Sequence, residues 1–343
     1  MNRGLAGMSS PARQPVVANA VCYMDDTQGS SQFHRVDERG RRELYLNCSI
    51  VSLRSALMHN PGIDAALVVN FDVPASRRRE IESFGIAIHK LDFVTFRMPD
   101  AFPWSGAYFK LEALAYLLEL YQHVTLIDCD TFTVGSYQDM HRESAEHILL
   151  YDIQHRLSHE HRRHVIENHR LLCGESVSLV HYGGEIVAGP AALLKRFVAV
   201  CAEVASVLRQ RSSLITHDMG DEQIISVAAH RMPRSVRSAN AYLFRYWTGR
   251  DFRLLSTNYL FNAVDIWHLP AEKQNGLQAL YRYLIRHGNF PTRDMCVRIT
   301  GLDRPNAGRI AEQQRRIKND FTPTSGGFGR SVRRLVEVVL RQT

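Results

Sequence analysis

The sequence is poor in lysine and lacks several common cysteine and membrane signals. Only five of its 42 basic residues are lysines, so arginine supplies nearly all of the positive charge. Its six cysteines include no C-x-x-C pair, which excludes a zinc site of that spacing and a thioredoxin motif. Their scatter is typical of a reducing compartment, so we expect a cytoplasmic protein. No uncharged apolar run reaches 18 residues, and no membrane span is predicted.

Short motifs of other enzyme classes are also missing. The sequence has no G-x-x-x-x-G-K-[ST] phosphate loop, and the glycines at 326–329 lack Rossmann spacing. The segment 159–164 is not H-E-x-x-H, because Arg163 stands in place of the second histidine. His155 and His159 are one helical turn apart and could share a transition metal, although a solvated polar face is the simpler interpretation. Residues 1–15 have no apolar core of a signal peptide and are expected to form a loose tail.

The composition that is present is that of a globular protein. The chain has 343 residues, 45% of them hydrophobic and 22% charged, which excludes full disorder, collagen and coiled coil. The length allows one large α/β domain or two smaller ones. The net charge of +7 leaves acidic ligands, anionic lipid headgroups and nucleic acid open as partners.

Strands and helices alternate through the first half of the chain. Short apolar runs predict buried strands, and patterns with a period of three to four predict helices. This alternation favours an α/β fold with a mostly parallel sheet and helices on both faces, whose ligands bind at the carboxyl ends of the strands. The expected strands are 16–23, 65–70, 86–91 and 124–127, and the expected helices are 44–59, 76–84 and 107–121.

The second half is less regular. Residues 141–176 are rich in His and Arg and predict a surface insertion that carries a helix. Short strands are expected at 177–181 and 185–188. One helix is expected to begin at Pro190, and two more to span 221–230 and 272–287, with Gly288 ending the last.

These segments predict one main domain, residues 16–300. The His- and Arg-rich segment divides it into a first half, 16–140, and a second half, 177–300. Residues 301–343 are expected to form a linker and a basic amphipathic helix, which packs on the domain or contacts an anionic membrane peripherally.

An acidic pair ends the fourth predicted strand. Asp128 and Asp130 flank Cys129, and in an extended backbone residues i and i+2 point to the same side. Two carboxylates so close favour a cation between them, and oxygen ligands suit Mg²⁺ or Mn²⁺. The alternative is a solvated turn between a strand and a loop.

The segment around this pair resembles a known enzyme family. Lys110, followed by a helix and by the run V-T-L-I-D-C-D-T-F-T-V-G at 124–135, is similar to the core of GT-A-fold glycosyltransferases, above all the glycogenin-like family 8. The resemblance implies that Asp128 and Asp130 hold Mn²⁺ on the diphosphate of a nucleotide sugar, and that Lys110 contacts this donor.

Three later segments extend the resemblance in the same order. Residues 182–187, Y-G-G-E-I-V, resemble the family's F-N-x-G-V-M strand, and residues 220–223, G-D-E-Q, resemble its G-D-Q-D turn. Asn262 and the strand 264–268 resemble a late strand whose final histidine, here His268, completes the metal site. Lys273 departs from the family's K-P-W motif, since it follows His268 at five residues and is followed by Gln-Asn.

The resemblance and the chemistry of glycosyl transfer assign further roles. Asp221, Glu222 and Gln223 are candidates for stabilising an oxocarbenium-like state, although Asp221 could instead cap a helix. Asp25 and Asp26 could bind the uracil or ribose of the donor, or cap their own loop. The residues expected to contact the donor are Tyr23, Asp25, Asp26, Lys110, Asp128, Cys129, Asp130, Gly184 and Lys273.

The sequence therefore predicts a metal-dependent glycosyltransferase. The resemblance implies that residues 16–300 are the catalytic domain, with a nucleotide-binding half, 16–140, and a sugar- or acceptor-binding half, 177–300. The enzyme would move a hexose from a UDP-sugar, with Mn²⁺ or Mg²⁺ and retention of configuration, to a saccharide, lipid-linked or protein acceptor, and would not bind nucleic acid. One alternative is a HAD-type phosphatase with Asp128 as nucleophile, although residue 132 does not fit that motif. Another is a non-catalytic binding protein of the same fold.

Overall fold

The computed structural model describes residues 14–24, 38–99, 104–154, 157, 159–174, 180–214, 220–246 and 263–303. Several predictions concern positions outside these ranges: most of the N-terminal tail, Asp25, Asp26, Asn262, His155 and the C-terminal segment beyond residue 303. The structure does not test those predictions.

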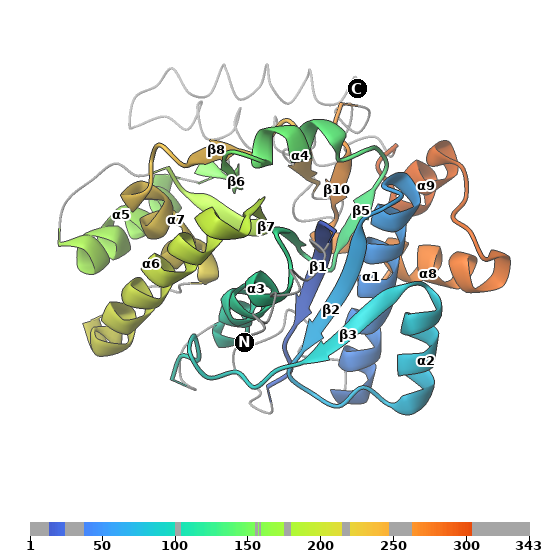
Figure 1. The fold of residues 1–343 in the computed structure, drawn as a ribbon, viewed down its shortest axis with the longest axis horizontal. Coiled ribbons are helices and arrows are strands. Elements are labelled where there is room, and N and C mark those ends of the chain that lie inside the picture. Colours follow the sequence, from blue (N-terminus) through green and yellow to red (C-terminus); the bar gives the residue numbers. More distant parts are fainter. Residues whose placement is uncertain are drawn as a thin grey trace, which may run out of the picture.

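A seven-stranded sheet with the order β3-β2-β1-β4-β7-β6-β8 forms the centre of the molecule. All neighbouring pairs are parallel except the two made by β7, which is antiparallel to both β4 and β6 (Figure 1). The α/β fold with a mostly parallel sheet is therefore confirmed. The strands are β1 (Val16–Val21), β2 (Asp64–Val69), β3 (Ile86–Lys90), β4 (His123–Ile127), β6 (Ile148–Asp152), β7 (Tyr182–Pro190) and β8 (Val236–Ser238).

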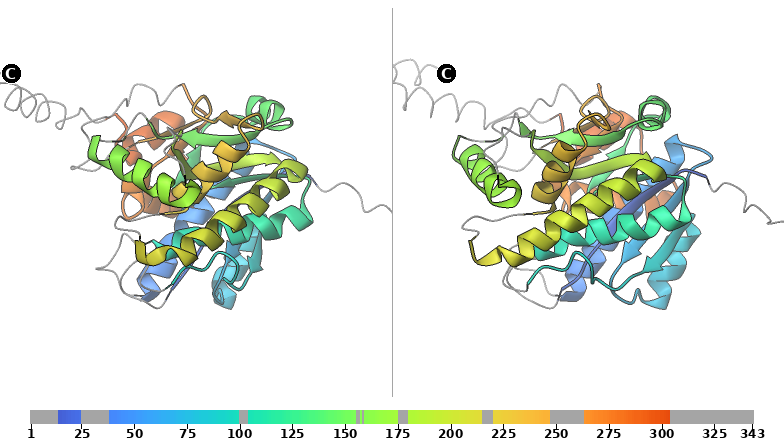
Figure 2. Two further views of the ribbon diagram at one scale, coloured as in Figure 1. Left: turned by 90° about the vertical axis from the view of Figure 1, so that its left-hand side faces the viewer. Right: turned by 60° about the vertical axis from the view of Figure 1, so that its left-hand side comes forward.

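Helices cover both faces of this sheet (Figure 2). Along β1, Val17 and Val21 pack in one apolar core with α1 (Glu38–His59) and α8 (Gly276–His287). Val16 and Ala18 point the other way, into a second core with α3 (Phe109–Leu120), α6 (Ala191–Gln210) and α7 (Asp221–Arg231). β1, β2, β4 and β6 are buried on both faces, which is why their sequences are largely apolar runs.

A second, three-stranded sheet connects the acidic pair to the late part of the chain. β10 (Ile266–His268) lies between β5 (Thr131–Thr133) and β9 (Leu243–Arg245). Its register places His268 opposite Thr131, the residue directly after Asp130. The buried ring of Trp267 packs on Phe132 at a centroid distance of 5.8 Å, which holds the two strands together. The late histidine thus lies beside the acidic pair.

The segment expected to be a surface insertion contains a strand of the main sheet. β6 lies between β7 and β8 and is almost entirely buried. Its run I-L-L-Y-D was not predicted as a strand, because it stands in a segment rich in histidine. The helix expected there is confirmed as α5 (His159–Cys173), and α4 (Gln138–Ser144) precedes β6. Within the described chain, therefore, this segment is not a purely superficial insertion.

Other boundaries differ from the predictions for local reasons. α1 begins six residues before the predicted position 44. The prediction missed its first turns because they are polar and lack an apolar pattern. β7 is continuous through the Tyr-Gly-Gly segment, where two short strands were expected, and residues 180–181 are not in a strand. Pro190 ends β7 and precedes α6 instead of being its first residue. The short β5, β8 and β9 and the helix α9 (Arg293–Thr300) were not predicted. Gly288 does end α8, with φ of 71°.

In the described part of the chain, none of the helices combines the length and the apolar character needed to span a bilayer.

A buried histidine on α5 predicts a pH-dependent stability. His169 is 1% exposed, and neither ring nitrogen has a hydrogen-bond partner among the described residues. Its pKa is lowered to about 3, mainly by burial and to a smaller extent by the charges of His181 and His230. The unfolded chain, with a histidine pKa of about 6.5, binds the extra proton as the pH falls, so this residue costs about 2 kcal/mol of stability at pH 5.

We expect His169→Leu to remove that cost. Urea unfolding of the wild type and of the variant, between pH 7 and pH 5, should show a smaller loss of stability in the variant by about 2 kcal/mol. Parallel stability curves for the two proteins over this interval would contradict the prediction.

Candidate functional site

An open pocket of about 210 Å³ lies at the edge of the sheet where β1 and β4 end and β7 begins. This is the edge at which ligands of parallel α/β sheets bind. Its charged lining comes from five separate parts of the chain, which the two sheets, α3 and the start of α7 bring together. The residues that matter for its chemistry are Lys110, Asp128, Asp130, Gly184, Asp221 and Lys273.

The acidic pair lies in a turn and not in an extended strand. β4 ends at Ile127, and Thr131 donates from its backbone N–H and its hydroxyl to the carbonyl oxygen of Asp128, at 3.3 and 2.9 Å. The two carboxylates nevertheless converge, as predicted, because the turn aims both at His268. Cys129, which was expected to contact the donor, lines the pocket as well, and burial raises the pKa of its thiol well above the usual value.

The acidic pair and the late histidine form a compact group of metal-ligand type. Nε2 of His268 is 3.2 Å from Oδ1 of Asp130 and 3.7 Å from Oδ2 of Asp128. One ligand atom from each of the three residues lies within 4.8 Å of the others. Two carboxylate oxygens and an imidazole nitrogen fit Mn²⁺ and are acceptable to Mg²⁺. The three residues expected to be metal ligands therefore lie together, and their binding of a metal stays a prediction.

Two lysines neutralise the carboxylates of the site. Lys273 forms an ion pair with Asp130, and Nζ of Lys110 lies 2.7 Å from Asp128 and 3.2 Å from Asp221. Burial alone would raise the pKa of Asp130, but Lys273 and His268 outweigh burial and hold that pKa below its usual range. Burial likewise opposes the charge of Lys110, yet the two aspartates keep its pKa above the ordinary value. Asp130 and Lys110 are therefore both charged at neutral pH.

Asp221 lies in the pocket and is not a helix cap. Gly220 occupies the N-cap position of α7, and Asp221 begins the helix with its carboxylate directed at Lys110. Burial is the main cause that raises the pKa of Asp221 to about 6, with Lys110 opposing and Glu222 and Asp128 adding to the increase. A Cβ at Gly184 would overlap the Asp221 carboxylate and Nζ of Lys110, so a larger residue there would displace this ion pair.

The next two residues of α7 point in different directions. Glu222 lines the pocket, 3.3 Å from the guanidinium of Arg245 and 3.7 Å from Nε2 of His181. Gln223 is buried, does not line this pocket, and donates from Nε2 to the carbonyl oxygen of Val165 on α5 at 3.4 Å. The structure thus brings Asp221 and Glu222 to the site and leaves Gln223 outside it.

Tyr23 lies beside the main pocket. It lines a smaller neighbouring cavity, where the guanidinium of Arg42 is 4.1 Å from the centre of its ring. Its backbone N–H and C=O both bond the side-chain amide of Asn70, each at 2.7 Å. The end of β1 is therefore fixed to the end of β2, just before the segment that carries Asp25 and Asp26.

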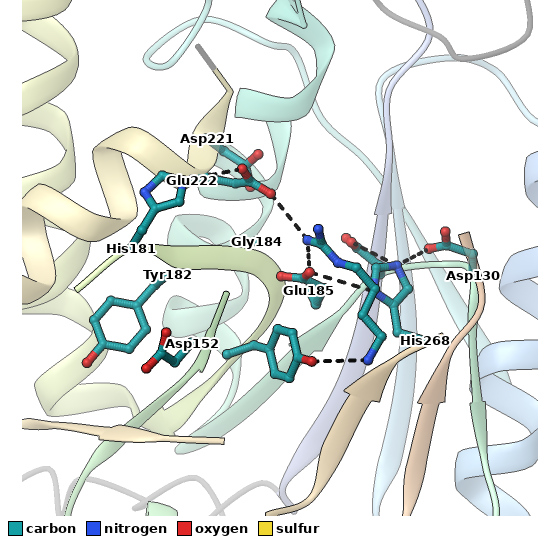
Figure 3. A network of polar contacts seen from close by, with 12 residues as sticks. Asp130, Asp152, His181, Tyr182, Gly184, Glu185, Asp221, Glu222 and His268 are labelled. Atoms are coloured by element: carbon teal, nitrogen blue, oxygen red, sulfur yellow. Dashed lines mark hydrogen bonds and ion pairs between the residues drawn. The ribbon is translucent and has the colours of Figure 1, made fainter. Parts of the chain in front are cut away.

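Two charged residues that the sequence analysis did not single out complete the site. Figure 3 shows a continuous series of contacts from His181 through Glu222 to an arginine, then to Glu185, His268 and Asp130. The arginine is Arg245, from β9, which forms ion pairs with both glutamates. Glu185 is 0% exposed. The available signal was a charged residue within the otherwise apolar run E-I-V-A of β7.

Of the comparisons with known proteins, only the one with solved structures gives matches. No protein-family model matches the chain, and no curated protein matches it. Among 310 matching chains of known structure is the crystal structure of mouse xyloside xylosyltransferase 1, apo form. It is 10% identical, with a TM-score of 0.48, over 76% of this chain and 99% of that chain. Likeness at this level says nothing about activity, so the proposal below rests on the site.

Proposed function

We propose that the protein is a metal-dependent glycosyltransferase that takes a hexose from a nucleotide-diphosphate sugar, with a UDP-sugar as the expected donor. The observation that carries the proposal is the group formed by Asp128, Asp130 and His268, which faces an open pocket at the carboxyl edge of the sheet. Lys110 and Lys273 flank this group. Carboxylates that attract a divalent cation, with lysines beside them, form a site suited to a diphosphate.

Each charged residue has a distinct part in such a transfer. A divalent cation held by Asp128, Asp130 and His268 would act as a Lewis acid on the departing diphosphate. Lys110 and Lys273 can exchange a carboxylate partner for a phosphate oxygen and so bind the donor. Asp221, held by Lys110, is placed to stabilise positive charge that develops on the sugar. Retention of configuration is part of the proposal.

The acceptor remains open between a saccharide, a lipid-linked molecule and a protein. Loops usually carry this specificity. Peripheral membrane contact through residues 301–343 and a cytoplasmic location likewise remain predictions.

Thermal unfolding with nucleotides tests the proposal. We expect UDP or GDP with Mn²⁺ to stabilise the wild type by roughly 2.7 kcal/mol at one hundred times the dissociation constant. Neither nucleotide nor metal alone should produce this shift. Asp130→Asn should abolish it, because the variant loses a ligand oxygen charge at the centre of the site.

The matched control is Asp139→Asn, whose carboxylate is 72% exposed in an ion pair with Arg142 and does not line the pocket. It should keep the full shift. If no nucleoside diphosphate stabilises the wild type, the donor site does not exist and a binding protein becomes the better hypothesis. A stable aspartyl-phosphate formed at Asp128 would instead identify a phosphatase.

A further inference from the structure

Glu185 places a carboxylate in the interior of the sheet, directly beneath the candidate metal site. It is fully buried on β7, between β4 and β6. Its backbone carbonyl accepts the N–H of Asp128 at 3.0 Å, so β7 and the acidic turn are joined at this point. A buried carboxylate costs several kcal/mol unless its charge is matched, so its partners define what it does.

Both partners come from the small sheet. β9 and β10 are parallel, with Arg245 directly opposite His268. The carboxylate of Glu185 forms an ion pair with Arg245, and its Oε1 is 3.8 Å from Nδ1 of His268 (Figure 3). The imidazole therefore has a carboxylate on each side: Glu185 at Nδ1, and Asp130 at Nε2. Among the residues described, Nδ1 has no hydrogen-bond partner at its present distance.

Gly183 shows that the chain makes room for this carboxylate. A Cβ built at Gly183 would overlap the carboxylate oxygens and carbon of Glu185. Any larger residue at 183 would therefore displace the Glu185 side chain. The place of the carboxylate is therefore defined by the backbone as well as by its ion pair.

We propose that Glu185 is a positioning residue for His268. This inference rests on the cation site of the proposed function, but not on sugar transfer. A neutral imidazole carries one proton, and only its unprotonated nitrogen can bind a metal. By accepting the N–H of Nδ1, Glu185 leaves the lone pair of Nε2 facing Asp128 and Asp130. The present 3.8 Å needs to shorten by less than about 1 Å to reach hydrogen-bond distance.

Mn²⁺ binding separates this role from a purely structural one. Titration of the wild type, with the EPR signal of free Mn²⁺ as the readout, gives the affinity without any substrate. Glu185→Met removes the acceptor and should weaken Mn²⁺ binding by about 10- to 100-fold, as outer carboxylate partners of metal-bound histidines do. Glu185→Gln keeps a carbonyl oxygen at the same place and should retain most of the affinity.

A double variant guards against the loss of the fold. Glu185→Met leaves Arg245 without one of its two carboxylates, whereas Glu185→Met with Arg245→Met replaces the buried ion pair by apolar side chains, which is often tolerated. If Glu185 acts on His268, the double variant folds and still binds Mn²⁺ weakly. If Glu185 serves only to neutralise Arg245, the double variant recovers the affinity of the wild type, and the proposal is overturned.

The tautomer of His268 is a second readout. In the Mg²⁺-bound wild type, long-range ¹H–¹⁵N spectra should show the proton on Nδ1, and Glu185→Met should lose the hydrogen-bonded form of that signal. A spectrum unchanged by Glu185→Met would overturn the positioning role alone. A wild type that binds neither Mn²⁺ nor Mg²⁺ would overturn the cation site, and with it both proposals.

Discussion

Lys110→Met should destabilise the protein by about 3–5 kcal/mol, the cost of removing one partner from a buried ion pair. The side chain of Lys110 is 13% exposed and lies between Asp128 and Asp221. It also donates to the backbone carbonyl of Gly184 on β7. Methionine has a similar length but no charge, so two carboxylates would face each other without the cation that separates them. Urea unfolding at pH 7 measures the loss.

Two matched variants test that explanation. Lys195→Met removes an exposed ion pair with Glu119 and should change stability by no more than about 1 kcal/mol. Lys110→Met combined with Asp221→Asn removes one of the stranded charges, so it should recover part of the loss. A double variant no more stable than Lys110→Met would show that lost packing, and not unpaired charge, is the cause.

The same neutralisation explains how the site exists before any ligand arrives. Asp128, Asp130 and Asp221 are held close together, and two of them are 5% exposed or less. Like charges in such a place would normally drive one carboxylate to bind a proton. Lys273 and His268 hold the pKa of Asp130 below its usual range, whereas burial raises the pKa of Asp221 to about 6. The site is therefore already arranged for a cation and an anionic ligand.

Local patterns were sufficient for most of the main sheet. β1, β2 and β4 are short apolar runs because both of their faces are covered, and this pattern needs no knowledge of distant residues. β6 was not predicted, because its local sequence does not show which part of the fold it belongs to. Its five residues stand between two polar helices, α4 and α5, and only the pairing with β7 and β8 shows that this apolar run belongs to the main sheet.

The candidate site divides in the same way. The acidic pair and His268 were predicted from motifs in a fixed order, and the register of β10 against β5 is what makes them neighbours. The contact between Glu185 and Arg245 joins residues on different sheets, and no local spacing predicts it. Gln223 illustrates the reverse error, because on a helix consecutive residues point in different directions and only Asp221 and Glu222 reach the pocket.

Asp128→Asn should reduce sugar transfer by about 10³-fold, equivalent to roughly 4 kcal/mol of transition-state stabilisation. Asn keeps the shape of the side chain but removes the charge that a cation at this site needs. The fold should tolerate the change, since the Asp128 side chain is 26% exposed and Lys110 keeps Asp221 as a partner. The measurement is the release of UDP from a UDP-sugar, by hydrolysis or transfer, at saturating Mn²⁺.

The contrast with Gln223→Ala makes this prediction specific. Gln223 was a candidate for the same chemistry, but its amide contacts α5 and it does not line the pocket. Its replacement should lower stability modestly and leave turnover per folded molecule within a few-fold of the wild type. If Asp128→Asn retains the turnover of the wild type, the acidic pair does not hold the catalytic cation. If Gln223→Ala instead loses turnover without unfolding, α5 and α7 must rearrange when the donor binds, because only then could Gln223 reach the sugar.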